Sequence, residues 1–130
     1  MQVFGTDLAK GKTTTASSNL NTSTKPSFAT DGNASNLWTS SVGKSQWLQV
    51  DLGAKSQIHR LVLDFAKLAP KQYQVQISDN GTTWTTIYHV NNNERSVNDI
   101  SNLSLDVRYV RVVNGEDKAI SLRTLQVYGQ

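Results

Sequence analysis

Few residues of this 130-residue chain could act in catalysis, and they form no catalytic pattern. Hydrolysis of a glycosidic bond uses two carboxylates about 5 to 10 Å apart across a cleft. Asp64 and Glu116 could supply such a pair, but nothing in their spacing singles them out. His59 and His89 lie far apart without metal-ligand spacing, and no serine lies in a nucleophile-elbow motif. We therefore expect a domain that is not an enzyme.

The segment Asp31-Gly32-Asn33 offers a different chemistry, the binding of a hard cation. Carboxylate and amide oxygens beside a flexible glycine are typical of Ca²⁺ sites. The same segment also suits an Asx-turn, in which the Asp31 side chain accepts a hydrogen bond from the backbone two residues on. The sequence leaves both interpretations open.

The composition indicates one folded domain with polar loops, of an extracellular type. Hydrophobic residues make up 37% of the chain and charged residues 18%. A chain of this length forms one domain and buries about two thirds of the surface that it exposes when unfolded. There is no cysteine, which excludes disulfides and thiolate metal sites. We predict a single domain over residues 1–130, monomeric and cut from a longer protein.

Charge and hydropathy narrow the classes of partner. The formal net charge is +3, and Lys and Arg are scattered along the sequence. A nucleic-acid interface presents a basic stripe, so we expect no nucleic-acid partner. No apolar run approaches the roughly 20 residues that a membrane-spanning helix needs, so we expect no membrane insertion.

Alternating hydrophobicity predicts strands along most of the chain. Residues 47–53 place Leu48, Val50 and Leu52 on one face, and Gly53 is expected to end that strand. Residues 58–65 form the next strand. Residues 72–78 alternate most cleanly, and Asn80-Gly81 behind them predicts a hairpin with a strand that carries Trp84 and Ile87.

Further strands are predicted on weaker patterns. The β-branched run at 13–18 favours an edge strand. Leu103 and Leu105 suggest a short strand, and residues 107–113 and 122–128 suggest two more. Because no segment has a convincing helical pattern, we predict an all-β antiparallel sandwich.

Six motifs in this order resemble one domain family. They are Ala29-Thr30-Asp31-Gly32-Asn33, Trp38-Thr39-Ser40-Ser41, residues 47–53, Trp84, residues 108–112, and Ser121-Leu122 with Val127-Tyr128-Gly129. Together they resemble a discoidin-type (coagulation factor F5/8 type C) domain, in the style of bacterial family 32 carbohydrate-binding modules. The resemblance spans about Asp7 to Gly129 and implies a jelly-roll sandwich of the galactose-binding-like type.

The resemblance also implies where a ligand binds. In family 32 modules the sugar lies on loops at one end of the sandwich, here residues 64–71, 91–98 and 114–120, with 19–25 nearby. Trp38, Trp47 and Trp84 occupy framework positions and are expected in the core, which leaves Tyr88 as the ring most expected to be exposed. An aromatic residue that the family often has before Ser-Leu is missing, since Lys118-Ala119-Ile120 stands there. The implied ligand residues are Asp64, Lys67, Tyr88, Glu94, Arg95, Asn114, Glu116 and Lys118.

A structural calcium ion is the cofactor that the resemblance implies. Its ligands would come from Asp31 and Asn33, joined by Asn36 and Thr124 at positions where the family has Thr and Glu. Only one carboxylate remains in this set. We therefore expect either weakened calcium binding or an empty site.

The implied function is non-catalytic polysaccharide binding. Such a module targets a covalently linked glycoside hydrolase or polysaccharide lyase to its substrate, and a glucan, chitosan or a uronate polymer all stay open. An adhesion module for a protein or cell-surface ligand is the alternative, with Leu68 the one apparent apolar spike. A structural spacer that has lost its ligand is a third interpretation. We expect a secreted, extracellular, bacterial protein.

Overall fold

The computed structural model describes residues 7–33, 35–67 and 69–129. Its elements are almost all strands, joined by two short 3-10 helices. They are β1 (Thr13–Ala16), η1 (Thr22–Thr24), η2 (Pro26–Ala29), β2 (Trp38–Thr39), β3 (Trp47–Asp64), β4 (Tyr73–Ser78), β5 (Thr85–Val90), β6 (Val97–Ile100), β7 (Leu105–Asn114), β8 (Ser121–Leu122) and β9 (Thr124–Gly129). The all-β prediction is confirmed.

Strand β3 belongs to both layers of the sandwich. Its first half pairs with β1 and β7, and its second half pairs with β6 and β9. The register with β7 shifts between Asp51 and Ser56, and Gly53 there has a φ of +88°. The prediction that Gly53 ends the strand was therefore wrong. The positive φ that glycine tolerates bends the strand instead, and the chain continues into the second layer.

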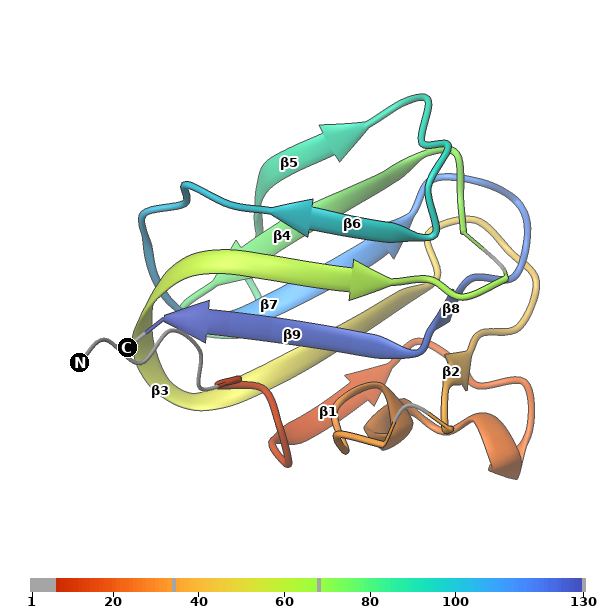
Figure 1. The fold of residues 1–130 in the computed structure, drawn as a ribbon, viewed down its shortest axis with the longest axis horizontal. Coiled ribbons are helices and arrows are strands. Elements are labelled where there is room, and N and C mark those ends of the chain that lie inside the picture. The colour runs from red at the N-terminus through yellow and green to blue at the C-terminus, as the bar shows by residue number, and fades with distance from the viewer. Residues whose placement is uncertain (1–6, 34, 68, 130) are drawn as a thin grey trace.

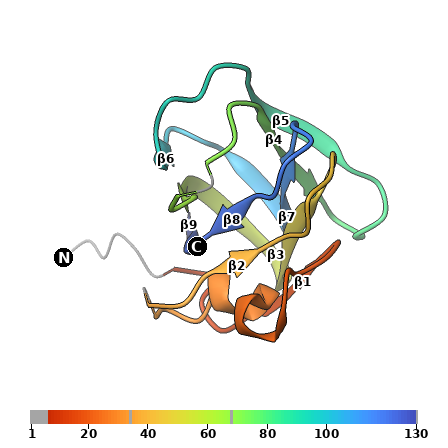
Figure 2. The ribbon, with the colours of Figure 1, turned by 90° about the vertical axis from the view of Figure 1, so that its right-hand side faces the viewer.

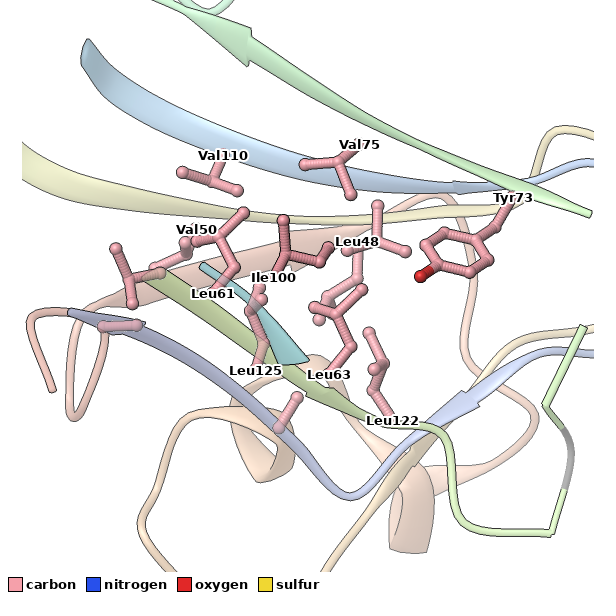
Figure 3. Close-up of a cluster of buried hydrophobic side chains, with 14 of the residues drawn as sticks. Leu48, Val50, Leu61, Leu63, Tyr73, Val75, Ile100, Val110, Leu122 and Leu125 are labelled. Atoms are coloured by element: carbon pink, nitrogen blue, oxygen red, sulfur yellow. The ribbon is translucent and has the colours of Figure 1, made fainter. Parts of the chain in front are cut away.

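The two layers face each other across one hydrophobic core. One layer has the strand order β1-β3-β7-β4-β5, and the other consists of β6, the second half of β3, and β9 (Figure 1). Leucine and valine side chains from both layers meet between them, together with the buried Tyr73 (Figure 3). The period-two pattern of residues 48–52 and 73–75 thus points inward as predicted, because alternate side chains of a strand share one face.

The tryptophans divide into one buried anchor and two residues on the outer face. Trp38 is fully buried and donates a hydrogen bond from Nε1 to the Ser18 carbonyl at 2.9 Å. Trp47 and Trp84 are only half-buried, so their predicted place in the core was wrong. They lie against the Arg111 guanidinium, whose carbon is 4.6 Å from the Trp47 ring centroid and 3.8 Å from that of Trp84. Such cation–π contacts need a face that is open to the charged side chain.

Two further boundaries differ from the predictions. The β4–β5 hairpin forms as predicted, but Trp84 precedes β5. The short strand expected around Leu103 is absent from the described residues, and Val97–Ile100 forms β6 in its place. Near the chain ends, Asp7 bridges Tyr128 and its carboxylate accepts a hydrogen bond from the Val127 N–H. This bridge lies beside the bend of β3, at the opposite end from the long connecting loops (Figure 1).

Candidate ligand-binding site

Five loops converge at one end of the sandwich, which we call the loop end (Figure 2). They comprise residues 17–25, 40–46, 65–72, 91–96 and 114–120. The strands that they connect run in antiparallel fashion, so their turns alternate between the two ends and these five come together. Apart from residues 40–46, these are the regions in which the resemblance placed the ligand.

Asn93 ties two of these loops together. Its backbone N–H donates to the Lys71 carbonyl at 2.9 Å, and its side-chain amide donates to the Pro70 carbonyl at 3.0 Å. Its Oδ1 accepts from the Arg95 N–H at 3.1 Å, and the residue is buried. A buried amide with every group bonded fixes its surroundings, so Glu94 and Arg95 are held next to residues 70–71. The sequence suggested only a loop tip here.

Asn114 organises the last loop in the same manner. Its Oδ1 accepts from the Glu116 N–H at 3.0 Å, and its Nδ2 donates to the Lys118 carbonyl at 2.7 Å. The residue is 2% exposed. Its side chain therefore positions Glu116 and Lys118, and a direct hydrogen bond from Asn114 to a ligand stays a prediction.

Gly115 permits the close approach of this loop to residues 65–72. Its N–H donates to the Gln72 carbonyl at 2.9 Å. A Cβ at this position would lie 2.9 Å from the Gln72 Cβ and 3.1 Å from its carbonyl oxygen, so any other residue would push the loops apart.

A shallow cavity of about 280 Å³ opens between these two loops. Four of the predicted ligand residues meet there, and Lys71 joins them. The Glu116 carboxylate accepts a hydrogen bond from the Lys71 N–H, which holds it at the cavity wall. The lining residues are Lys67, Ala69, Pro70, Lys71, Asn114, Glu116, Lys118 and Ala119. Charged groups over a small apolar floor are typical of a site that binds polar rings.

The other predicted ligand residues lie outside this cavity. Glu94 and Arg95 are exposed on the neighbouring loop. Asp64 accepts from the Ala66 N–H at 2.9 Å and lies 3.7 Å from Arg123 Nη1, so its carboxylate is already engaged. Tyr88 is 37% exposed on β5, with its ring 6.4 Å from that of Tyr73. Their contact with a ligand stays a prediction.

Two exposed apolar side chains lie on neighbouring loops of the loop end, and the sequence did not single them out. Leu20 is 57% exposed and Val42 is 71% exposed, on adjacent loops that are joined by the hydrogen bond from the Leu20 N–H to the Thr39 carbonyl at 2.8 Å. Leu68, the residue predicted as an apolar spike, lies outside the described residues.

The proposed calcium ligands form a self-contained turn. Asp31 Oδ1 accepts from the Asn33 N–H at 2.8 Å, and Oδ2 accepts from the Asn36 side-chain amide at 2.8 Å. Asn36 thus presents a donor where a cation needs an oxygen. Thr124 lies in β9 opposite Asp64, and no group of three or more acidic or histidine side chains within the described residues could hold a metal ion. These side chains form a hydrogen-bonded Asx-turn, and the binding of calcium there stays a prediction.

The outer faces of the sheets, by contrast, hold their charges in pairs. Arg108 donates to Asp51 from Nε at 2.7 Å and from Nη2 at 3.0 Å. This hydrogen-bonded pair lowers the pKa of Asp51 below its usual range. Arg60 holds Asp99 in the same two-point manner and lowers the pKa of Asp99. These bidentate pairs link neighbouring strands.

Another hollow, of about 320 Å³, lies beside the β4–β5 hairpin, at the end opposite to the loop end. Its polar groups are committed to the turn, since Ser78 Oγ accepts from the N–H groups of Asn80 and Gly81. Asn80 Oδ1 accepts in turn from the Thr82 and Thr83 N–H groups. The loop end, where four of the predicted ligand residues line one cavity, is the better candidate site.

His59 and His89 are exposed, as expected of surface histidines, and lie on β3 and β5. Among the described residues, no helix has the length and apolar character to cross a membrane.

Comparisons with known proteins agree with this geometry. Two chitosan-binding modules from the chitosanase/glucanase of Paenibacillus sp. IK-5 are similar in structure. Module 1 has a TM-score of 0.89 at 33% identity, covering 95% of this chain and 99% of that one. Module 2, solved with chitotriose, has a TM-score of 0.88 at 31% identity, covering 94% and 99%.

More distant structures share the fold alone. The module CpGH89CBM32-5 from Clostridium perfringens, solved with GalNAc-β-1,3-galactose, has a TM-score of 0.81 at 20% identity, covering 94% of this chain and 99% of that one. No curated protein sequence matches the chain. The F5/8 type C domain family matches residues 13–124, which contain β1 to β8 in full and the first residue of β9. The chain therefore belongs to the F5/8 type C (discoidin) domain family.

Proposed function

We propose that the domain is a non-catalytic carbohydrate-binding module whose sugar ligand lies on the loop end. The observation that carries this proposal is the 33% identity, over nearly the full length of both chains, to a module that binds chitosan. The cavity between residues 66–72 and 114–120 supports it, because four of the residues expected to contact sugar meet there. Neither the carboxylate pair Asp64 and Glu116 nor the two histidines form a catalytic arrangement, since Asp64 is paired with Arg123 and both histidines are exposed.

Binding at this site would be weak for a single ring. The cavity is shallow, and its lining contains no aromatic ring. Attachment to a catalytic domain would compensate, because a tether raises the effective concentration of that domain at an insoluble polymer. We therefore propose a secreted bacterial glycoside hydrolase or polysaccharide lyase as the parent protein. Leu20 and Val42, on neighbouring loops of the loop end, could contact the C–H faces of neighbouring sugar rings.

Native affinity electrophoresis through gels that each contain one polysaccharide tests this function. The panel comprises α- and β-glucans, chitosan, alginate, pectin and a galactan. We expect retardation by at least one polymer that persists at raised salt, since recognition of hydroxyl groups is not screened. The variant Glu116→Ala should no longer be retarded by that polymer. The control Thr83→Ala, in the hollow at the other end, should be retarded as much as the unmodified domain. Absence of retardation in every gel would contradict the proposal.

A second candidate function, adhesion to a protein, is favoured by the exposed Leu20 and Val42. Apolar side chains on adjacent loops are typical of protein contact sites. The double variant Leu20→Ser/Val42→Ser distinguishes the two functions. It would abolish adhesion to a protein surface, whereas it should weaken retardation by a polysaccharide only in part.

A further inference from the structure

Charge is distributed unevenly between the loop end and the rest of the molecule. Outside the loop end, the chain has seven Lys and Arg residues and also seven Asp residues, so the formal charges there sum to zero. The loop end therefore carries the whole formal net charge of +3. Basic residues that are scattered in the sequence therefore gather on one surface of the folded domain. The loop end has six cations, Lys25, Lys44, Lys67, Lys71, Arg95 and Lys118, and three carboxylates, Glu94, Glu116 and Asp117.

The cations of the loop end are not neutralised by carboxylates of the chain. The ion pairs between described residues involve Lys55, Arg60, Arg108 and Arg123, all of which lie outside the loop end. No described Asp or Glu is within ion-pair distance of a loop-end cation. Lys25 lies over the Phe28 ring at 5.1 Å, and the other five cations of the loop end have no such contact among the described residues.

Three of these lysines, Lys67, Lys71 and Lys118, line the cavity together with a single carboxylate. Glu116 already accepts a hydrogen bond there from the backbone N–H of Lys71. The lining residues thus carry a net positive charge, which disfavours a protonated amino sugar. The same charge favours a sugar that carries a carboxylate, because complementary charge sets which ligand is preferred.

We propose that the loop-end cavity binds an acidic saccharide, whose rings carry carboxylates, in preference to a protonated glucosamine polymer. This inference rests on the proposed carbohydrate-binding function and names the class of sugar. The lysine ammonium groups pair with the sugar carboxylate. Glu116 accepts a hydrogen bond from a ring hydroxyl, which distinguishes a sugar from other anions.

The test compares an anionic saccharide with its neutral ester and with a cationic saccharide. Isothermal titration of the domain uses oligogalacturonate, the same oligosaccharide as its neutral methyl ester, and chitosan oligomers of equal length. We expect the free acid to bind up to about fivefold more tightly than the ester for each ion pair that forms, as one exposed ion pair provides at most about 1 kcal/mol. Chitosan oligomers should bind least, and raised salt should remove the advantage of the acid.

A pair of variants with equal net charge locates the effect. Lys71→Gln/Lys118→Gln should abolish the preference for the acid over the ester, whereas Lys10→Gln/Lys12→Gln, in the segment just before β1, should retain it. Thermal unfolding of both variants checks that the fold is unchanged. If instead both double variants lower the preference equally, the cavity is not its source and the inference is overturned.

The other outcomes separate this inference from the function on which it rests. Equal binding of acid and ester, or tighter binding of chitosan, overturns the acidic-sugar inference and leaves carbohydrate binding intact. Equal affinity for heparin, duplex DNA and oligogalacturonate identifies a general polyanion surface and also overturns it. Failure of every saccharide to bind overturns both.

Discussion

On the outer faces of the two sheets, Arg60 and Arg108 each hold a carboxylate with two hydrogen bonds, across neighbouring strands. At the loop end, Lys71 and Lys118 face a cavity with no described carboxylate in ion-pair distance. In the sheets, the charged side chains pair with each other and link neighbouring strands. The loop end leaves charges available, at some cost in repulsion, and available charge is what a binding site needs. We therefore expect the sheets to provide stability and, under the proposed function, the loops to provide recognition.

The largest expected effect is on stability and would come from a substitution in the core between the sheets. Leu63 is fully buried between the layers, and Leu63→Ala should lower the free energy of unfolding by about 2 to 5 kcal/mol because it leaves a cavity in the core. Urea unfolding followed by tryptophan fluorescence measures it. Sugar affinity of the fraction that stays folded should be unchanged, and a loss of affinity there would argue against the separation of roles.

Asn93 contributes both to stability and to the position of the loops beside the cavity, so its substitution should affect stability and sugar binding together. Asn93→Ala should cost about 1 to 3 kcal/mol, since the Pro70 carbonyl and Arg95 N–H lose their buried partner. It should also weaken sugar binding, because residues 91–96 are no longer held beside the cavity. Asn92→Ala, the exposed neighbour, is the control and should change neither the unfolding midpoint nor the titration curve.

Acid should weaken the ion pair between Asp51 and Arg108. The pKa of Asp51 is lowered in the folded domain by its hydrogen bonds from Arg108, so its stabilising effect is present at neutral pH. That effect is lost as the pH falls below the ordinary Asp value of about 4 and through the folded-state pKa. The midpoint of urea unfolding should therefore drop on acidification, and less steeply in Arg108→Gln. Equal pH profiles for the two proteins would contradict this.

The smallest expected effect concerns calcium. Because both oxygens of Asp31 are engaged by Asn33 and Asn36, the turn needs no ion. Thermal unfolding in excess chelator and in excess CaCl₂ should differ by less than about 1 °C, since only a ligand of the folded state raises the midpoint. A midpoint that climbs with calcium concentration would reinstate a structural calcium site.

The local pattern predicted the strands well where one face of a sheet is buried. Tyr73 and Val75 point into the core because the pleat of a strand alternates its side chains. The same alternation places Trp47 on the face opposite the buried Leu48, so the period of two predicts the outer position of Trp47. The inference from family framework positions outweighed that signal and gave the wrong result. Gly53 was recognised as a positive-φ residue, but the sequence does not reveal whether such a residue ends a strand or bends it.

Much less of the site could be predicted, because its parts come together only through contacts between loops. Lys67, Glu116 and Lys118 were identified by their place in the expected loops. Lys71 lies in the same predicted loop as Lys67 but was not among the predicted ligand residues. Nothing in the sequence marks Asn93 as a buried link, because an asparagine in a polar run has the same pattern whether it is exposed or buried. The gathering of positive charge likewise depends on which turns share one end of the sandwich.

The bridge between Asp7 and Tyr128 has a practical consequence for how the domain can be presented. Both ends of the described chain meet at the pole where β3 bends, and the binding loops occupy the opposite pole (Figure 1). A tag, a bead or a fused protein joined at either end would therefore lie opposite the loop end and leave the loop end exposed. Either terminus can serve as the attachment point in a sensor or an affinity matrix, and neither choice would obstruct a long polymer lying across the loops.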